Sequence, residues 1–394
     1  MRYDVIVAGA GPAGSTAARV LARQGASVFL LDRARFPRDK PCGGGVTLRA
    51  ASALDIDIAP VVERTIYGAR FSLRLGGHFD RFYDRPLTYM TQRCRLDEFL
   101  ANAAVEAGAD FHDGEQILEV EADGVAGGVT LRTASGSYEG RVLVGADGAN
   151  GIVGRWLGPR HWEDGVALEG NLPYSDDIPL EWHELVALDL GGLAGGYGWV
   201  FPKGDHLNVG VGAWKYAGFT LRPKLAELCR RYGFDSEALE SLRGHHLPLR
   251  QAGSPVAKGP VLLVGDAAGF VDPLSGEGIH MACYSASLAA DAIGDVLAGR
   301  AADLRGYQRA IEEIIQPELD LSRDLQELFH FAPPPYVAMM RGSERFWHLF
   351  CRLIRGDFTY QSLTRRLGPM RVAVGYFAGV ARRRRLARLS GTLN

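Results

Sequence analysis

The chain has no uninterrupted apolar run of about 18 residues, the length that a membrane-spanning helix needs, so none is predicted. Its five cysteines are widely spaced and include no Cys-x-x-Cys pair, which argues against a disulfide framework and against a zinc site. The apolar start lacks the basic region and cleavage site of a signal peptide. We therefore expect a cytoplasmic protein without a metal centre.

The chain also lacks an excess of positive charge, because its 44 lysines and arginines stand against 46 acidic residues and the formal net charge is −2. This balance argues against nucleic-acid binding driven by bulk electrostatics. The charge is unevenly distributed, however. The stretch from Arg341 to the end holds twelve arginines, no lysine and only two acids, Glu344 and Asp357. A basic tail of this kind suggests an acidic partner or an anionic surface.

Glycine, in contrast, is abundant, with 50 residues where an average chain of this length has about half as many. The hydrophobic share of 47% and the charged share of 23% are those of an ordinary globular protein, and the length predicts two or three domains. The glycine excess fits a backbone that turns tightly or approaches a ligand closely in several places.

The N-terminal segment combines a strand, a glycine-rich turn, a helix and a second strand. The apolar run 4–8 predicts a buried parallel strand, and the Ala-rich stretch that ends before Gly25 predicts a helix. Between them stands Gly9-x-Gly11-x-x-Gly14, and Asp32 ends the second strand. This arrangement predicts a dinucleotide whose pyrophosphate lies at the helix N-terminus and whose ribose is bound by Asp32.

Later segments bear on which dinucleotide is bound, since the motif alone leaves NAD and FAD open. Arg93 precedes a predicted helix at 96–107, and the strand-like run ending at 144 leads into an Asp147-Gly148 pair. The buried run 261–264 leads into Gly265-Asp266, and Pro273 and Gly276-Glu277-Gly278 follow it. No second Gly-x-Gly-x-x-Gly exists, so no dedicated nicotinamide domain is predicted.

With these motifs in this order, most of the first ~300 residues resemble the FAD-dependent oxidoreductases of the aromatic-hydroxylase superfamily. The resemblance implies that Asp266 lies at the ribityl chain or pyrophosphate. It also implies that the amides of residues 276–278 face the N1/O2 edge of the flavin, where a helix N-terminus stabilises negative charge. The residues expected to bind FAD are Gly9, Gly11, Ala13, Gly14, Asp32, Arg33, Cys42, Gly43, Arg93, Asp147, Gly265, Asp266, Pro273, Gly276, Gly278 and Ile279.

The chain departs from that superfamily in one place. After Asp147-Gly148 the superfamily usually has Ser and then Arg, whereas this chain continues with Ala149, Asn150 and Gly151. No role is therefore carried over to Arg155.

Two further segments narrow the class: Lys40-Pro41-Cys42-Gly43-Gly44-Gly45, and the predicted strand pair that contains Tyr197-x-Trp199-x-Phe201-Pro202. They resemble the geranylgeranyl reductase family, whose members reduce isolated C=C bonds of prenyl chains on lipids, chlorophyll precursors or quinones. The resemblance implies a prenylated, hydrophobic substrate and the catalytic residues Cys42, Gly44, Tyr197 and Trp199. Cys42 would act as a weak acid or shape the pocket, and a small buried apolar side chain is the alternative.

A prenyl chain needs a long apolar tunnel, and the β-rich stretch 160–250 supplies large side chains for one. These are Trp162, Leu168, Trp182, Leu188, Tyr197, Trp199 and Phe201. The alternative for each of them is a place in the core of the sheet. The expected fold class is α/β, with a Rossmann-type FAD-binding domain made of residues 1–60, 90–160 and 255–300. An antiparallel-sheet substrate domain takes 61–89 and 161–254, and a helical C-terminal region takes 301–394.

Two other functions stay open at this point. The first is an oxygen-using flavoenzyme, a monooxygenase or a halogenase. Halogenases of this superfamily carry Trp-x-Trp-x-Ile-Pro, whereas this chain has Tyr197 in place of the first Trp and Phe201 in place of the Ile, which argues against halogenation. The second is a flavin-binding protein without catalysis that acts through its basic tail. The electron donor is open between NADPH and ferredoxin.

Arginines flank an apolar run at 372–381 near the C-terminus. They are Arg365, Arg366, Arg371, Arg382, Arg383, Arg384, Arg385 and Arg388. This run is too short to cross a bilayer, but an amphipathic segment can lie in the interface with its arginines on lipid phosphates. We expect peripheral binding to an anionic membrane, and the alternative is that these helices pack on the body and expose a solvated basic face.

Overall fold

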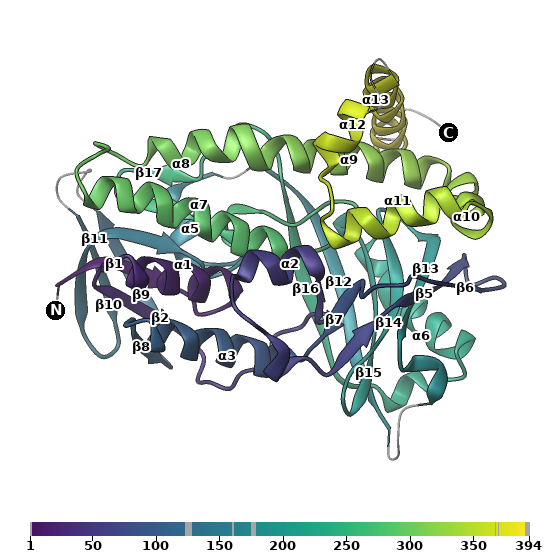
Figure 1. The fold of residues 1–394 in the computed structure, drawn as a ribbon, viewed down its shortest axis with the longest axis horizontal. Coiled ribbons are helices and arrows are strands. Elements are labelled where there is room, and N and C mark those ends of the chain that lie inside the picture. The colour runs from purple at the N-terminus through teal and green to yellow at the C-terminus, as the bar shows by residue number, and fades with distance from the viewer. Residues whose placement is uncertain are drawn as a thin grey trace.

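The computed structural model describes residues 2–122, 128–159, 161–174, 179–366, 368 and 370–390. Two large sheets lie next to each other, and a layer of helices from the second half of the chain covers them along one long side (Figure 1). The expected α/β fold class is confirmed. The expected domain boundaries stay a prediction, and the last four residues of the 301–394 region lie outside the described residues.

The first sheet is the nucleotide-binding one. Its path runs β17-β18-β11-β1-β2-β8, with β10 and β9 attached to β11. The strands are β1 (Arg2–Ala8), β2 (Val28–Asp32), β8 (Asp110–Asp113), β9 (Ile117–Ala122), β10 (Val129–Thr133), β11 (Ser137–Gly145), β17 (Ala257–Lys258) and β18 (Val261–Leu263). The apolar run of β1 is fully buried because β1 pairs in parallel with β2 and β11 and is covered on both faces.

Helices with small side chains pack against this sheet. They are α1 (Pro12–Arg23), α3 (Arg93–Glu106), α5 (Ile152–Leu157) and α7 (Ile279–Leu297). Along α1 and α7, alanines such as Ala17 and Ala286 are completely buried, which brings the two helices close together. The ends of β1 and β2, together with the N-termini of α1 and α7, therefore meet at one edge of the sheet.

The second sheet has the order β16-β12-β15-β14-β13-β5-β6. Its strands are β5 (Gly68–Leu73), β6 (Phe79–Phe82), β12 (Trp162–Pro173), β13 (Leu185–Leu193), β14 (Gly196–Pro202), β15 (His206–Trp214) and β16 (Glu240–Arg250). The sheet was expected to be antiparallel, but β5 and β13 pair in parallel. This difference arises because β5 comes from a distant part of the chain and joins the sheet at its β13 edge.

One face of this second sheet is covered by a helix that lies between its strands in the sequence. Helix α6 (Leu221–Arg231) packs on that face and buries Val209 and Val211 of β15 beneath Leu225 and Leu228. A small sheet of β3 (Gly45–Thr47), β7 (Thr88–Met90) and β4 (Arg64–Ile66) lies beside α2 (Leu48–Leu54).

The C-terminal region is helical, as expected. It comprises α8 (Arg305–Ala310), α9 (Gln316–Phe331), α10 (Pro333–Gly342), α11 (Glu344–Arg355), α12 (Tyr360–Arg366) and α13 (Met370–Leu389). Trp347 of α11 is buried against Phe71 of β5 and donates a hydrogen bond of 2.8 Å from its indole N–H to the carbonyl of Phe82. These contacts fasten the helical region to the second sheet.

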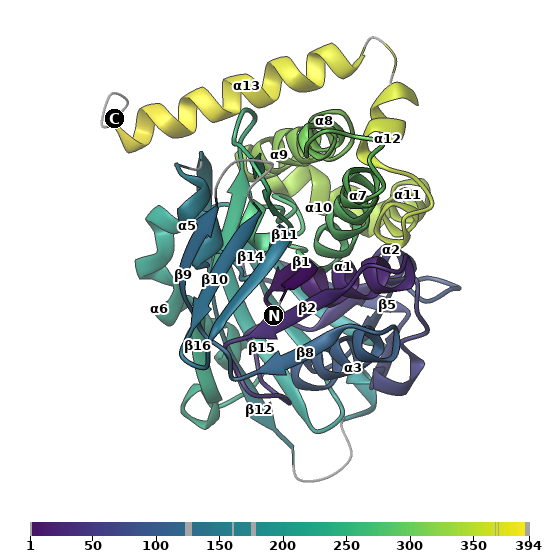
Figure 2. The ribbon, with the colours of Figure 1, turned by 90° about the vertical axis from the view of Figure 1, so that its left-hand side faces the viewer.

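Helix α13 is a single long helix that runs across the outside of α9 (Figure 2). Arg382 lies 3.4 Å from Asp324, and the guanidinium of Arg385 binds Glu327 and Glu163 with closest distances of 2.6 and 2.7 Å. These two arginines are therefore engaged within the protein. Within the described residues, no helix has the length and apolar character to cross a bilayer.

Candidate functional site

A cavity of about 560 Å³ runs between the two sheets and under α9–α12. One end lies at the glycine-rich turn before α1, and the other end is surrounded by apolar side chains of α10–α12. Cys42, Gly43, Tyr197 and Trp199 line the stretch between these ends. The cavity therefore joins the expected dinucleotide site to the expected catalytic residues.

The glycines of the first motif act through the backbone. Gly9 has φ +107°, a conformation that favours glycine, and a Cβ on Gly14 would overlap the carbonyl of Gly9. Gly11 precedes α1 without any side-chain cap, so the first amide groups of that helix are free to bind an anion. Gly11 and Ala13 line the cavity, whereas Gly9 and Gly14 shape the turn beneath it.

Asp32 lies at the end of β2, directly beside this turn. Its carboxylate accepts hydrogen bonds of 2.9 Å from the amides of Ala10 and Ala34 and lies 3.6 Å from Arg38. Asp32 thus supports the turn, and its contact with a ribose stays a prediction. Arg33 is exposed and does not line the cavity, so the expectation that its side chain binds the cofactor finds no support. Arg38 takes that place near Asp32.

Arg93 begins α3 and lines the cavity, as the sequence predicted. Its guanidinium binds the carboxylate of Asp97 through two hydrogen bonds of 2.7 Å, and Arg38 reaches the same carboxylate at 2.8 Å. Because Asp97 is completely buried, it fixes both guanidinium groups at the edge of the cavity.

Two of the expected cofactor residues serve the fold around the site. Asp147 accepts a hydrogen bond of 3.0 Å from the amide of Val153 at the start of α5. Gly265 has φ +56°, and its amide donates to Ser285 at 3.0 Å. Neither residue lines the cavity, because each turns toward the adjoining helix.

Asp266 lies at the cavity wall with two basic partners. Lys40 approaches it at 3.3 Å and His245 at 3.8 Å. Burial disfavours the ionised carboxylate, but these two partners outweigh burial and hold the pKa of Asp266 well below its usual range. Asp266 is therefore ionised at neutral pH and can accept hydrogen bonds from the hydroxyl groups of a ligand.

The turn at 273–278 presents backbone to the cavity. Pro273, Gly276, Gly278 and Ile279 line it, and Gly278 precedes α7 without a side-chain cap. The hydroxyl of Tyr197 donates to the carbonyl of Ser275 and so ties this turn to the second sheet. The amides of Ser275, Gly276 and Glu277 donate hydrogen bonds within the turn, so the amides open to a ligand are those at the start of α7, which face the same space as Cys42.

These features fit FAD. Two helix N-termini without side-chain caps open onto one continuous cavity, and both are flanked by residues too small to fill it. The amides at α1 suit the pyrophosphate, and those at α7 suit the electron-rich edge of a flavin.

Cys42 lies in a tightly held loop. The amide of Gly44 donates to its Sγ at 3.3 Å, and the amide of Cys42 donates to Glu169 Oε1 at 2.5 Å. Lys203 is buried and donates to the carbonyls of Gly43 and Thr91, the latter at 3.1 Å. Burial lowers the pKa of Lys203 to about 8. Gly44 has φ +65° and packs against Lys203, which explains why glycine stands there.

Glu169 and Lys203 were missed by sequence reasoning. Lys203 directly follows the Tyr197–Pro202 motif, so its position was a usable signal. Glu169 carries no local signal, because only the pairing of β12 with β15 and β16 brings it to the cavity.

The predicted tunnel residues divide between the two faces of the second sheet. Leu188, Tyr197, Trp199 and Phe201 line the cavity. Leu168 packs on the opposite face of the sheet in the core under α6, and Trp182, which ends the short helical turn Leu180–Trp182, packs in the same core. Trp162 packs against Gly269, so the alternative of a core position describes these three residues better. Side chains alternate along a strand, so large residues of the same segment point to opposite faces.

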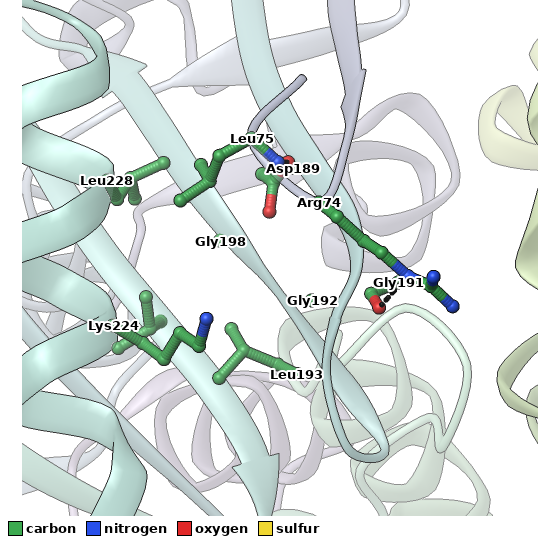
Figure 3. Close-up of a pocket in the computed structure, with 10 residues that line it drawn as sticks. Arg74, Leu75, Asp189, Gly191, Gly192, Leu193, Gly198, Lys224 and Leu228 are labelled. Atoms are coloured by element: carbon green, nitrogen blue, oxygen red, sulfur yellow. Dashed lines mark hydrogen bonds between the residues drawn. The ribbon is translucent and has the colours of Figure 1, made fainter.

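A second cavity, of about 350 Å³, lies on that opposite face of β13 and β14 (Figure 3). Asp189 points into it, held by hydrogen bonds of 2.7 Å from Ser72 and the amide of Leu75. Leu188 and Leu190, its neighbours in the sequence, line the large cavity instead. The second cavity contains none of the expected site residues.

We predict that Asp32→Ala weakens FAD binding by about 1.5–3 kcal/mol, the range for hydrogen bonds to a charged group. Fluorescence titration of the FAD-free protein measures this change. Asp110→Ala, at the start of the neighbouring strand β8 and away from the glycine-rich turn, is the matched control and should leave the affinity unchanged. Equal FAD affinity in the Asp32 variant and the wild type would contradict the ribose contact.

The chain is similar to known flavoproteins. A family model described as "FAD binding domain" matches residues 2–174. Menaquinone reductase from Mycobacterium tuberculosis is 38% identical over 73% of this chain and 76% of its own length. Geranylgeranyl diphosphate reductase from Rhodobacter capsulatus is 34% identical over 77% and 78%. Digeranylgeranylglycerophospholipid reductase 1 from Methanopyrus kandleri is 30% identical over 83% and 91%.

Solved structures agree with this grouping. A geranylgeranyl bacteriochlorophyll reductase-like protein from Thermoplasma acidophilum superposes with a TM-score of 0.75 at 25% identity, covering 83% of this chain and 87% of its own. A flavin-dependent brominase has a TM-score of 0.73 at 21% identity, covering 90% and 94%, and so shares the fold alone. The chain is an FAD-dependent oxidoreductase and belongs to the geranylgeranyl reductase family.

Proposed function

We propose that this enzyme saturates isolated C=C bonds in the prenyl chain of a hydrophobic substrate. The observation that carries the proposal is the long cavity, whose arm beyond the flavin site is lined by apolar side chains of both the second sheet and the C-terminal helices. Leu188, Phe201, Phe350 and Leu353 belong to this wall. Such an arm suits an extended hydrocarbon, whereas small polar substrates of other flavoenzymes would leave it unfilled.

The residues of the chain have separate tasks in this proposal. FAD, when bound and reduced, supplies the hydride. The amides at the start of α1 and α7 hold its charged parts, and the apolar arm orients the prenyl chain and excludes water. Cys42 lines the cavity between its two ends, which supports a role for its side chain at the reacting bond. NADPH and ferredoxin are both compatible electron donors.

Mass spectrometry of lipid extracts from cells with and without the active gene tests the function. We expect prenyl lipids to differ by steps of about two daltons, one step for each saturated bond. Prenylated quinones are the first class of lipid to examine, because one relative is named menaquinone reductase. If no prenyl lipid changes mass, the proposal is wrong. A stable C4a-oxygen adduct on reoxidation of the photoreduced flavin would favour the monooxygenase or halogenase alternative.

We predict that Cys42→Ser keeps FAD bound but slows alkene reduction at least tenfold, which is about 1.4 kcal/mol of barrier. The hydroxyl is nearly isosteric with the thiol, so packing changes little while the acidity and the surface at the reacting bond change. Steady-state turnover with a prenyl lipid measures the effect. Cys94→Ser, in a half-buried cysteine on α3 outside the cavity, serves as the control. Wild-type turnover of Cys42→Ser would make Cys42 a packing residue only.

We also propose that α13 docks on an anionic membrane at the cytoplasmic face. Its outer side exposes Val372, Tyr376 and Phe377 at 71, 64 and 59%, and Arg383 and Arg388 are exposed farther along. Apolar side chains beside cations suit the membrane interface. Arg382 and Arg385 do not contribute, since both are paired internally. The side chain of Arg371 lies outside the described residues.

Cosedimentation with vesicles tests this docking. We expect binding to anionic vesicles that weakens with salt and is reduced in Arg383→Glu/Arg388→Glu, at roughly 1 kcal/mol for each lost basic residue. Arg222→Glu, an exposed arginine on α6, makes the same charge change elsewhere and should bind as the wild type does. Equal binding to neutral and anionic vesicles would contradict the proposal.

A further inference from the structure

Saturation of a C=C bond requires a proton as well as a hydride, and an isolated alkene is a poor hydride acceptor. This proton can come from a group that lines the cavity and is protonated at neutral pH. Among the described residues of the cavity wall, the carboxyl groups are those of Glu169, Asp266, Asp272 and Glu277.

Three of these four carboxyl groups have a lysine or an arginine as a partner. Asp266 is paired with Lys40. Glu277 accepts a hydrogen bond of 2.8 Å from Arg49 Nε, and Asp272 accepts one of 2.8 Å from Ser322 while it lies 3.7 Å from the same arginine. A carboxylate stabilised by an arginine or a lysine is a poor proton donor.

Glu169 differs from them. It occupies β12, where alternate residues Gly165, Ala167 and Glu169 face the cavity. Its side chain is 92% buried, since its exposed fraction is 8%. Within the described part of the chain it forms no ion pair closer than 4 Å, and it accepts a hydrogen bond from the amide of Cys42. The carboxyl group thus lies beside the expected reaction centre without a cation that would keep it ionised.

Charged and titratable groups approach Glu169 from each element packed around it. From the loop before β3 come Asp39, Lys40 and Cys42, from the end of β14 comes Lys203, and from β16 come Arg243 and His245. Arg243 is paired with Asp39 at 3.1 Å, and Lys203 is held by backbone carbonyls. Burial outweighs the attraction of Lys203 and the hydrogen bond from Cys42, and it raises the pKa of Glu169 to about 7.

We propose that Glu169 is the general acid of the reaction, a catalytic residue that donates its proton to one carbon of the prenyl C=C bond. This proposal rests on the proposed function. The other carbon receives the hydride and its electron pair from the reduced flavin, which is left oxidised. The π bond is lost and two C–H bonds form. Glu169 is left as a carboxylate that regains a proton from water, and the amide of Cys42 stabilises it meanwhile.

Single-turnover measurements on FAD-loaded, photoreduced enzyme test the proposal with a prenyl lipid that the wild type reduces. We expect Glu169→Gln to retain FAD and to react about 100-fold more slowly, a typical contribution of a general acid. The wild-type rate should fall as the pH rises through about 7, because the donor loses its proton, and this dependence should be absent from Glu169→Gln. Glu169→Asp, which keeps a carboxyl group, should recover a pH-dependent rate.

Two variants serve as comparisons. Glu163→Gln makes the same substitution on β12 away from the cavity and should react as the wild type does. Cys42→Ser should be slower but keep the dependence near pH 7. If Glu169→Gln reacts at the wild-type rate or keeps that dependence, Glu169 is not the acid. If the wild type reduces no prenyl lipid at all, it is the proposed function that fails.

Infrared difference spectroscopy gives a readout independent of turnover. The protein without substrate should show a carboxylic-acid C=O band that titrates near pH 7 and is missing in Glu169→Gln but present in Glu163→Gln. A Glu169 that is already ionised at pH 5 would overturn the proposal.

Discussion

The second sheet has two apolar faces, and helix α6 covers one of them. Helix α6 closes that face with a packed core that includes Val209, Leu225 and Leu228. On the other face, Leu188, Trp199 and Phe201 border a cavity. Exposure of this apolar face to water would be unfavourable. The helices α9–α12 cover the cavity from the other side and so shield the face from solvent. Much of the remaining architecture follows from the need to close this face without filling it.

Charge is distributed along the cavity in a matching way. Near the flavin end, ionised groups come in pairs such as Lys40–Asp266 and Arg49–Glu277, which lowers the cost of burying them. The far arm includes His330, and burial lowers its pKa to about 4, so the imidazole is neutral at physiological pH. His330 therefore adds no charge to the arm at physiological pH, which keeps the arm suitable for a hydrocarbon chain.

The sequence predicted the elements that depend on local signals. The turn Gly9–Gly14, the helix that follows it and the position of Asp32 are set by chain-local steric and hydrogen-bonding needs, so their spacing identifies them. Glu169 could not be found in this way, because its place beside Cys42 depends on a loop meeting a strand more than a hundred residues later. The sequence left Leu168 open between the cavity and the core for a related reason, since hydrophobicity alone does not tell which face of a sheet a side chain joins. The pairing of β5 with β13 was equally invisible, because strand order depends on the whole topology.

The alternation along β13 gives the two faces of one strand independent uses. Leu188 and Leu190 face the large cavity, while Ala187 and Asp189 face the side of α6. A change of side-chain size at Leu188 or Leu190 therefore leaves the core under α6 in place and alters the space that is open to a hydrocarbon. We expect substitutions at these alternate positions to select prenyl chains of different length.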